Sequence, residues 1–331
     1  MFSIISFSCT NVNASHLHLH TLVAERIYAL KKLLLFITMI TMLLLAGCST
    51  APEKTPFAEG KLPVAVSFHA MDQLAKAIGG DYVDIHVIIP DGEEPHDFQP
   101  KASDLTALAK ARVLVLNGGD LENWAEKAVA SSGNKDLLVV TAADGADLIH
   151  VEGEGHDHHH DDHGIDPHVW LSPQNAKIEA RHVCDAFSKA DPDHADKYEQ
   201  NYQAFASSID EMVNEYKGKF EKTQRKSFVT GHAAFAYLAR DFGLTQYSVT
   251  DVFASGEPSA RQLAELTEQC KKDGIHTVFI EEMDNPKVSE TLAKEIGASI
   301  ETIDTMESGD PEESYLTAMR ANLEKIYQSL L

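Results

Sequence analysis

Three histidines occupy positions where the side chains of an α/β protein commonly meet a ligand. His96 follows an apolar, strand-like run at 83–89, His168 stands directly before a helical pattern, and His232 lies at a strand–turn–helix junction. Ligands of open α/β sheets bind outside the carboxyl ends of the strands, so histidines that lie far apart in the chain can converge on one crevice. Prolines beside His96 and His168 restrict the backbone and favour a preformed site.

Two acidic residues are candidates for a fourth group beside these imidazoles. Glu281 follows an apolar run at 277–280, and Asp304 follows another at 299–303, so both stand at a predicted strand end like His232. Three imidazoles and one carboxylate form an N3O donor set, which is well matched to tetrahedral Zn²⁺. A manganese site would use more oxygen donors. The residue pattern leaves both acids open as the fourth ligand.

A second concentration of histidine lies between residues 150 and 165. Neutral imidazole beside carboxylate binds divalent transition metals, but a flexible segment makes each such site weak. We interpret the loop as a low-affinity metal collector or sensor, and the alternative is a tolerated low-complexity insertion. Its histidines are His150, His156, His158, His159, His160 and His163.

Charge and motif content exclude several other functions. The chain of 331 residues carries 28 Lys and Arg against 51 Asp and Glu, a formal net charge of −23. Such an acidic surface repels phosphate backbones and attracts cations, so nucleic-acid binding is not expected. The sequence contains no nucleophile elbow, dinucleotide-binding glycine motif, phosphate loop or HExxH zinc motif. Cys184 and Cys270 fall inside helical patterns, where we expect them to be buried rather than nucleophilic.

The N-terminal segment predicts secretion and lipid anchoring. Lys31 and Lys32 precede an apolar run of 15 residues at 33–47, which is typical of a signal segment and short for a membrane-spanning helix. The run ends in Leu45-Ala-Gly-Cys48, which resembles a bacterial lipobox in which the cysteine is lipidated, with palmitate among its acyl chains. Residues 1–25 do not look like part of the signal and suggest an over-extended start, and residues 48–60 suit a flexible tether.

The body of the chain alternates strand-like and helical patterns, which predicts βαβ units and mainly parallel sheets. Between residues 193 and 222 an amphipathic pattern without proline predicts one long helix, with apolar positions three and four residues apart. We therefore expect an α/β fold of two βα lobes joined by one long rigid helix, with a metal site in the cleft between them. The predicted boundaries are 1–47 for the signal segment, 48–60 for the tether, 61–190 for the first lobe with its His-rich loop, 191–224 for the linking helix and 225–331 for the second lobe.

Several motifs together resemble one family. They are Cys48 with Glu94-Pro-His-Asp-Phe98, Asp166-Pro-His-Val-Trp-Leu-Ser-Pro173, Gly231-His-Ala-Ala-Phe235 and Gly256-Glu-Pro-Ser259. In order and approximate spacing, the chain from 62 to 331 is similar to the zinc-binding lipoproteins of the ABC-transporter metal-binding family (cluster A-I). The resemblance implies His96, His168 and His232 as the first three ligands. The fourth would be Asp304, which is slightly favoured, or Glu281, because relatives differ at this point.

The resemblance implies a binding protein and not an enzyme. It would capture Zn²⁺ as a transported ligand outside the cytoplasmic membrane, remain attached to that membrane through its lipid, and deliver the ion as a monomer to a permease driven by an ATPase. The alternatives are a manganese- or iron-binding homologue, a zinc-dependent hydrolase in which an acid activates metal-bound water, or an additional adhesin role. A closed four-ligand site favours binding, whereas an open coordination position would allow catalysis.

Overall fold

The computed structural model describes residues 31–32, 57–151, 164–253, 258–281 and 285–331. The chain divides into two units, Met1–Lys54 and Thr55–Leu331, and the second unit contains the sheets and the three histidines. Among the described residues no helix has both the length and the apolar character needed to cross a membrane. Apart from Lys31 and Lys32, the predicted signal segment lies outside the described residues, as do Cys48 and most of the tether.

Two four-stranded sheets, each wholly parallel, form the framework of the second unit. The first sheet has the order β2-β1-β3-β4 and the second β10-β9-β7-β8. The strands of the first sheet are β1 (Leu62–Val66), β2 (Val83–Val87), β3 (Val113–Leu116) and β4 (Leu138–Thr141). Those of the second are β7 (Ser227–Thr230), β8 (Thr245–Ser248), β9 (Thr277–Ile280) and β10 (Ser299–Thr302).

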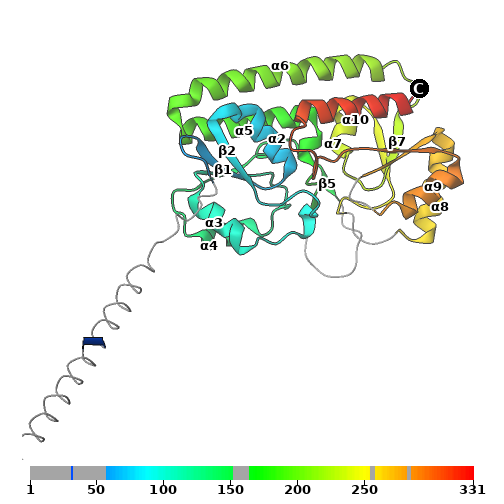
Figure 1. Ribbon diagram of the computed structural model, residues 1–331. Helices are drawn as coiled ribbons and strands as arrows, with labels where there is room; N and C mark the ends of the chain where they lie inside the picture. The colour runs from blue at the N-terminus through cyan, green and yellow to red at the C-terminus, as the bar shows by residue number, and fades with distance from the viewer. Residues whose placement is uncertain (1–30, 33–56, 152–163, 254–257, 282–284) are drawn as a thin grey trace, which may run out of the picture. The chain divides into compact units, whose positions relative to one another are not determined.

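Helices connect the strands and cover the sheets (Figure 1). Those of the first lobe are α2 (His69–Gly79), α3 (Ala102–Lys110), α4 (Ala125–Ser132) and α5 (Pro173–Ala190). After the long α6 (Ala195–Phe220) come α7 (Ala236–Phe242), α8 (Ala260–Asp273), α9 (Lys287–Ile296) and α10 (Tyr315–Ser329). Short 3-10 turns η1 (Gly80–Tyr82), η2 (Pro95–Asp97), η3 (Val169–Leu171) and η4 (Pro192–His194) complete the chain. The predicted fold class, two βα lobes with parallel sheets and one long helix, is confirmed.

The long helix α6 packs along elements of both lobes. Its 26 residues span about 39 Å at 1.5 Å per residue, and it contacts α2 and α5 of the first lobe and α7 and α10 of the second. In Figure 1 it lies along one side of both sheets with α10 beside it. One buried apolar cluster runs from Val64 of the first sheet to Phe228 and Phe279 of the second. The two lobes are thus packed on a shared core.

The second sheet also has a core of its own. Val229 and Val278 point to the opposite face from their neighbours Phe228 and Phe279, as the alternation along a strand requires. They pack there with Cys270 and other apolar side chains of α8 and α9. Cys270, like Cys184, is fully buried, as expected from the helical patterns around both.

Two irregular stretches of backbone lie close to His232. Strand β8 ends at Ser248: beyond it, the Val249 amide donates to the carbonyls of both Thr230 and Gly231, and the Thr250 amide donates to that of Gly231. Helix α7 begins only at Ala236, and before it the amide of Ala233 donates to the carbonyl of Asp251. The chain around His232 is therefore a turn secured by the neighbouring loop.

A short hairpin stands at the base of the His-rich loop. Strands β5 (His150–Val151) and β6 (Gly164–Ile165) pair antiparallel, with Val151 opposite Gly164. Residues 152–163, which include five of the six loop histidines, lie outside the described residues. His150 is exposed on β5.

Candidate metal site

His96 is presented by a single 3-10 turn after β2. Pro95 occupies the first position of this turn, and the Glu94 carboxylate accepts a hydrogen bond of 3.3 Å from the His96 backbone amide. The imidazole is 10% exposed, and its buried Nε2 has no hydrogen-bond partner among the described residues. An imidazole nitrogen that is shielded from water and makes no hydrogen bond has a lone pair available for a metal.

His168 is fully buried, and one nearby acid sets its orientation. The Asp166 carboxylate accepts from His168 Nδ1 at 2.8 Å and from its backbone amide at 3.0 Å. Because a carboxylate accepts the Nδ1 proton, Nε2 is left to face the site, the arrangement that metal-binding histidines usually have. Asn117 of the first lobe and Tyr237 of the second donate to the carbonyls of Pro167 and Asp166, at 2.9 and 2.6 Å.

His232 comes from the second sheet, directly after β7. Its backbone amide donates to Glu281 Oε1 at 3.2 Å, and its Nδ1 lies 3.9 Å from the same oxygen. Its Nε2 is 3.1 Å from the Nε2 of His168. The junction after β7 therefore turns this imidazole toward the first lobe.

Glu307 provides the carboxylate that meets these imidazoles. It is 5% exposed, and its Oε1 lies 3.5 Å from Nε2 of His96 and 3.5 Å from Nε2 of His168. That oxygen has no hydrogen-bond partner among the described residues, whereas Oε2 accepts from the Thr305 hydroxyl at 2.8 Å. The Thr305 contact fixes one carboxylate oxygen and leaves the other directed at the histidines.

The spacing of the four groups fits a tetrahedral ion. One ligand atom each from His96, His168, His232 and Glu307 lie within 4.8 Å of one another. A tetrahedron with metal–ligand bonds of about 2.0–2.1 Å has edges of roughly 3.3 Å. The separations of 3.1 and 3.5 Å between neighbouring ligand atoms are close to that edge. The donor set of three nitrogens and one oxygen suits Zn²⁺.

Electrostatics keep the carboxylate ionised in this buried place. Burial alone would raise the pKa of Glu307, but the imidazoles of His168 and His96 outweigh burial and hold that pKa well below its usual range. For His168, burial opposes protonation, yet the carboxylates of Asp166 and Glu307 raise its pKa to about 9. A cluster that attracts a proton this strongly in the absence of metal also attracts a divalent cation.

The two acids considered for the fourth ligand have other contacts. Glu281 lies behind His232, on the Nδ1 side of the ring, and supports its backbone. The Asp304 carboxylate accepts from the Met306 amide at 2.6 Å, and Met306 has a positive φ of 55°. Neither acid belongs to the group of four whose ligand atoms lie together. Asp304 instead stabilises the turn that directs Glu307 inward.

Glu307 is not among the candidates that the sequence pattern predicts. The pattern points to the first acid after the strand at 299–303, but the chain reaches the crevice only three residues later, after the turn at Met306. The sequence holds a weak signal for it: Glu307 precedes Ser-Gly-Asp-Pro in the loop before the last helix, and a loop that follows a strand end should line the crevice.

Comparison with known proteins assigns the chain to a family. The family described as zinc-uptake complex component A, periplasmic, matches residues 64–329. The high-affinity zinc uptake system protein ZnuA of Bacillus subtilis (strain 168) is 35% identical over 309 residues, 90% of this chain and 97% of that protein. The zinc-binding protein AdcA of Streptococcus pyogenes serotype M3 is 33% identical over 89% of this chain, which spans only 61% of AdcA.

A solved structure extends the likeness to three dimensions. The laminin-binding protein Lmb of Streptococcus agalactiae, described as bifunctional with adhesin and metal transporting activity, superposes with a TM-score of 0.74 at 33% identity, over 82% of this chain and all of that one. The chain, with its two lobes built on parallel sheets, its long helix and its buried cluster of three histidines, belongs to the family of periplasmic component A proteins of zinc-uptake complexes.

Proposed function

We propose that this protein is the extracytoplasmic zinc-binding component of an ABC importer. It captures Zn²⁺ between its lobes through His96, His168, His232 and Glu307 and delivers the ion to a membrane permease driven by an ATPase. The observation that carries the proposal is the buried cluster of three imidazoles and one carboxylate oxygen at tetrahedral spacing. Relatives named for zinc uptake and zinc binding support the choice of ion.

Four protein ligands favour binding over catalysis. Catalytic zinc sites keep one coordination position open for water or substrate, whereas a complete set of four ligands closes the site. The family is a solute-binding transport family, which agrees with this view. Zinc is therefore the transported ligand, which the protein binds and releases without chemical change.

Anchoring and the His-rich loop form the remaining parts of the proposal. Cys48 carries the lipid that attaches the monomer to the outer face of the cytoplasmic membrane, and the pneumococcal relative named zinc-binding lipoprotein AdcA supports this. The loop histidines, His150 among them, collect metal weakly beside the main site. We place the first lobe at 61–190, the linking segment that contains α6 at 191–224 and the second lobe at 225–331.

Competition between metals tests the proposal. The protein without metal is dialysed to equilibrium against equal low concentrations of Zn²⁺ and Mn²⁺, and the bound metals are quantified. We expect one tightly held zinc per chain and a large excess of bound zinc over manganese, because an N3O set favours zinc. Preferential retention of manganese, or no tightly held metal, would contradict the proposal.

A further inference from the structure

The loop that follows Glu307 is hydrogen-bonded to the loop that precedes His96. The Gly92 amide donates to the Ser308 hydroxyl at 2.9 Å, and the Gly309 amide donates to Asp91 Oδ1 at 3.3 Å. The two loops belong to different lobes, and the bonded residues are 216 and 218 positions apart in the chain. Each bond therefore ties the backbone beside one candidate ligand to the backbone beside another.

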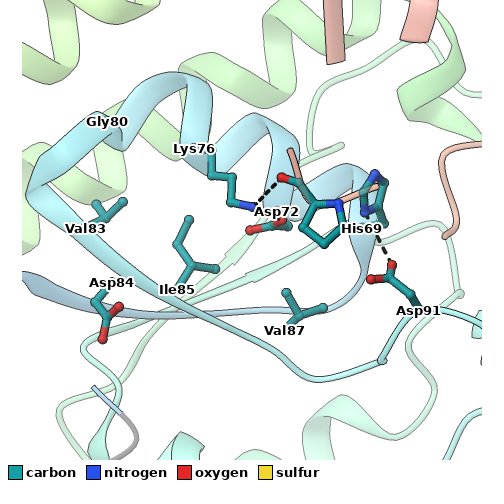
Figure 2. Close-up of a pocket in the computed structure, with 10 residues that line it drawn as sticks. His69, Asp72, Lys76, Gly80, Val83, Asp84, Ile85, Val87 and Asp91 are labelled. Atoms are coloured by element: carbon teal, nitrogen blue, oxygen red, sulfur yellow. Dashed lines mark hydrogen bonds and ion pairs between the residues drawn. The ribbon is translucent and has the colours of Figure 1, made fainter. Parts of the chain in front are cut away.

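A buried histidine outside the metal cluster completes this junction. His69, 5% exposed, places Nδ1 3.4 Å from Asp91 Oδ1, and Figure 2 shows this pair at the edge of a pocket of about 330 Å³. A Cβ added to Gly309 would stand 2.7 Å from His69 Nε2. Gly309 does not have the positive φ that only glycine tolerates well, so its small size, and not its backbone freedom, is what this position requires.

Further contacts hold the same loop against the first lobe. The ammonium of Lys76, which is labelled in Figure 2, donates to the carbonyl of Pro311 at 2.9 Å. On the other side of Glu307, the Trp170 indole donates to the Thr305 carbonyl at 2.7 Å. The chain from Thr305 to Pro311 comes from the second lobe, but it is bonded to the first lobe before and after the Glu307 carboxylate.

We propose that His69, Asp91, Gly92, Ser308 and Gly309 form a latch that sets the position of the Glu307 carboxylate relative to the His96 imidazole, and with it the rate at which bound zinc is lost. This inference rests on the proposed function. Metal ligands must be held within about 0.5 Å of their productive positions by the residues around them. The latch does this for the one carboxylate of the site, so its members are positioning residues that do not touch the ion.

A glycine substitution tests the close approach of His69. Gly309→Ala should raise the zinc dissociation rate, measured by transfer to a chromogenic chelator, about ten-fold, because the loop must move to relieve the contact with His69. In a His69→Ala background the same substitution should change the rate less than about two-fold, because the obstructing ring is gone. Gly218→Ala is the matched control: Gly218 lies in α6, has no positive φ, and has no atom within 4 Å of the added Cβ.

A pair of substitutions at Asp91 separates positioning from general stability. Asp91→Asn keeps the Oδ1 acceptor for the Gly309 amide, whereas Asp91→Ala removes it. We expect Asp91→Ala to accelerate zinc loss and to alter the visible absorption of Co²⁺ bound in place of zinc, and Asp91→Asn to restore both values toward those of the unsubstituted protein. A lower melting temperature in Asp91→Ala with unchanged zinc loss and an unchanged cobalt spectrum would overturn the latch.

The latch has a second readout that requires no metal. In the metal-free protein, Asp91→Ala should speed hydrogen exchange of the Gly309 and Gly92 amides, because both donate within the latch. Unchanged exchange at both amides would refute the latch even if zinc binds tightly. If the unsubstituted protein binds no zinc, the proposed function fails on its own, and the exchange result still decides whether the two loops are coupled.

Discussion

His168 and His232 lie 64 residues apart in the chain and on different lobes, yet their Nε2 atoms are 3.1 Å from one another. Two nitrogens of buried imidazoles at this distance repel when both rings are protonated, and they share a divalent ion favourably when both are neutral. The cluster therefore draws its side chains from both lobes, and a metal site built from it requires both of them.

Removing an imidazole from either lobe should abolish tight binding. His96→Ala and His232→Ala each delete one of the four proposed ligands, and we expect zinc affinity, measured by calorimetric titration, to fall by at least about 100-fold. His276→Ala is the control, because His276 is exposed directly before β9 and outside the cluster. Affinity equal to that of the control in either variant would contradict the site.

Substitution of the three acids discriminates between the candidates for the fourth ligand. Glu307→Gln should lower zinc affinity about 100-fold or more, because it removes the charged oxygen that faces two imidazoles. Asp304→Asn keeps an oxygen acceptor for the Met306 amide and should change affinity by less than about five-fold. Glu281→Gln should have an intermediate effect through His232. A loss in Asp304→Asn that exceeded the loss in Glu307→Gln would reverse this assignment.

Zinc binding and the stability of the metal-free protein should depend on pH in opposite directions. The pKa of His168 is raised to about 9, above the ordinary value of 6.5, so its protonated form stabilises the metal-free fold below pH 6.5. This contribution, of the order of 3 kcal/mol, is lost as pH rises from 6.5 through 9, while zinc affinity increases because fewer protons compete.

Urea unfolding and zinc titration at several pH values test this dependence. Asp166→Asn removes the carboxylate that orients His168 and helps to raise its pKa, so the variant should lose much of the pH dependence and bind zinc about 10- to 100-fold more weakly. A metal-free protein whose stability is constant between pH 6.5 and 9 would count against the role given to this pair.

A buried carboxyl group away from the site should reduce stability at neutral pH. Glu179 is fully buried on α5, and neither carboxylate oxygen has a hydrogen-bond partner among the described residues. Burial and the nearby Glu122 raise its pKa to about 8, so the unfolded chain releases a proton near pH 4.5 that the folded chain retains. Folding therefore loses stability as pH rises from 4.5 through 8.

Glu179→Gln tests this effect, because the amide has nearly the same shape and no charge. Its melting temperature should exceed that of the unsubstituted protein at pH 8 by several degrees, and the difference should shrink toward pH 4.5. Glu126→Gln, at an exposed position of α4, serves as the control. A gain that is the same at both pH values would exclude ionisation of Glu179 as its cause.

The His-rich loop should be dispensable for tight binding. Val151 and Gly164 are paired in the hairpin, so residues 152–163 can be replaced by Asn-Gly, a two-residue turn that suits antiparallel strands. We expect the tight site to keep its affinity and the number of weakly bound zinc ions per chain to fall, as measured by calorimetry. Loss of tight binding in this variant would show that the loop contributes to the main site.

The alternation of strands and helices, the long helix and the three histidines could all be predicted from the amino-acid sequence. These features depend on local signals. They are the apolar periodicity of each element, the Ser172-Pro173 start of α5, and the positions of His96 and His232, each of which follows the carboxyl end of a strand in its own parallel sheet. Each can be recognised within a window of a few residues, without knowledge of the rest of the chain.

Which acid lies beside the three histidines depends on long-range packing and could not be predicted from the sequence. Asp304, Glu281 and Glu307 all follow strands of one sheet, and nothing in their local sequence separates them. The choice depends on the turn at Met306, on Trp170 and on the contacts that draw the 305–311 loop onto the first lobe. Trp170 and Thr305 are 135 positions apart, and Gly92 and Ser308 are 216 apart. Because such pairings leave no periodic trace in the sequence, the direction of the Glu307 carboxylate became apparent only in the folded chain.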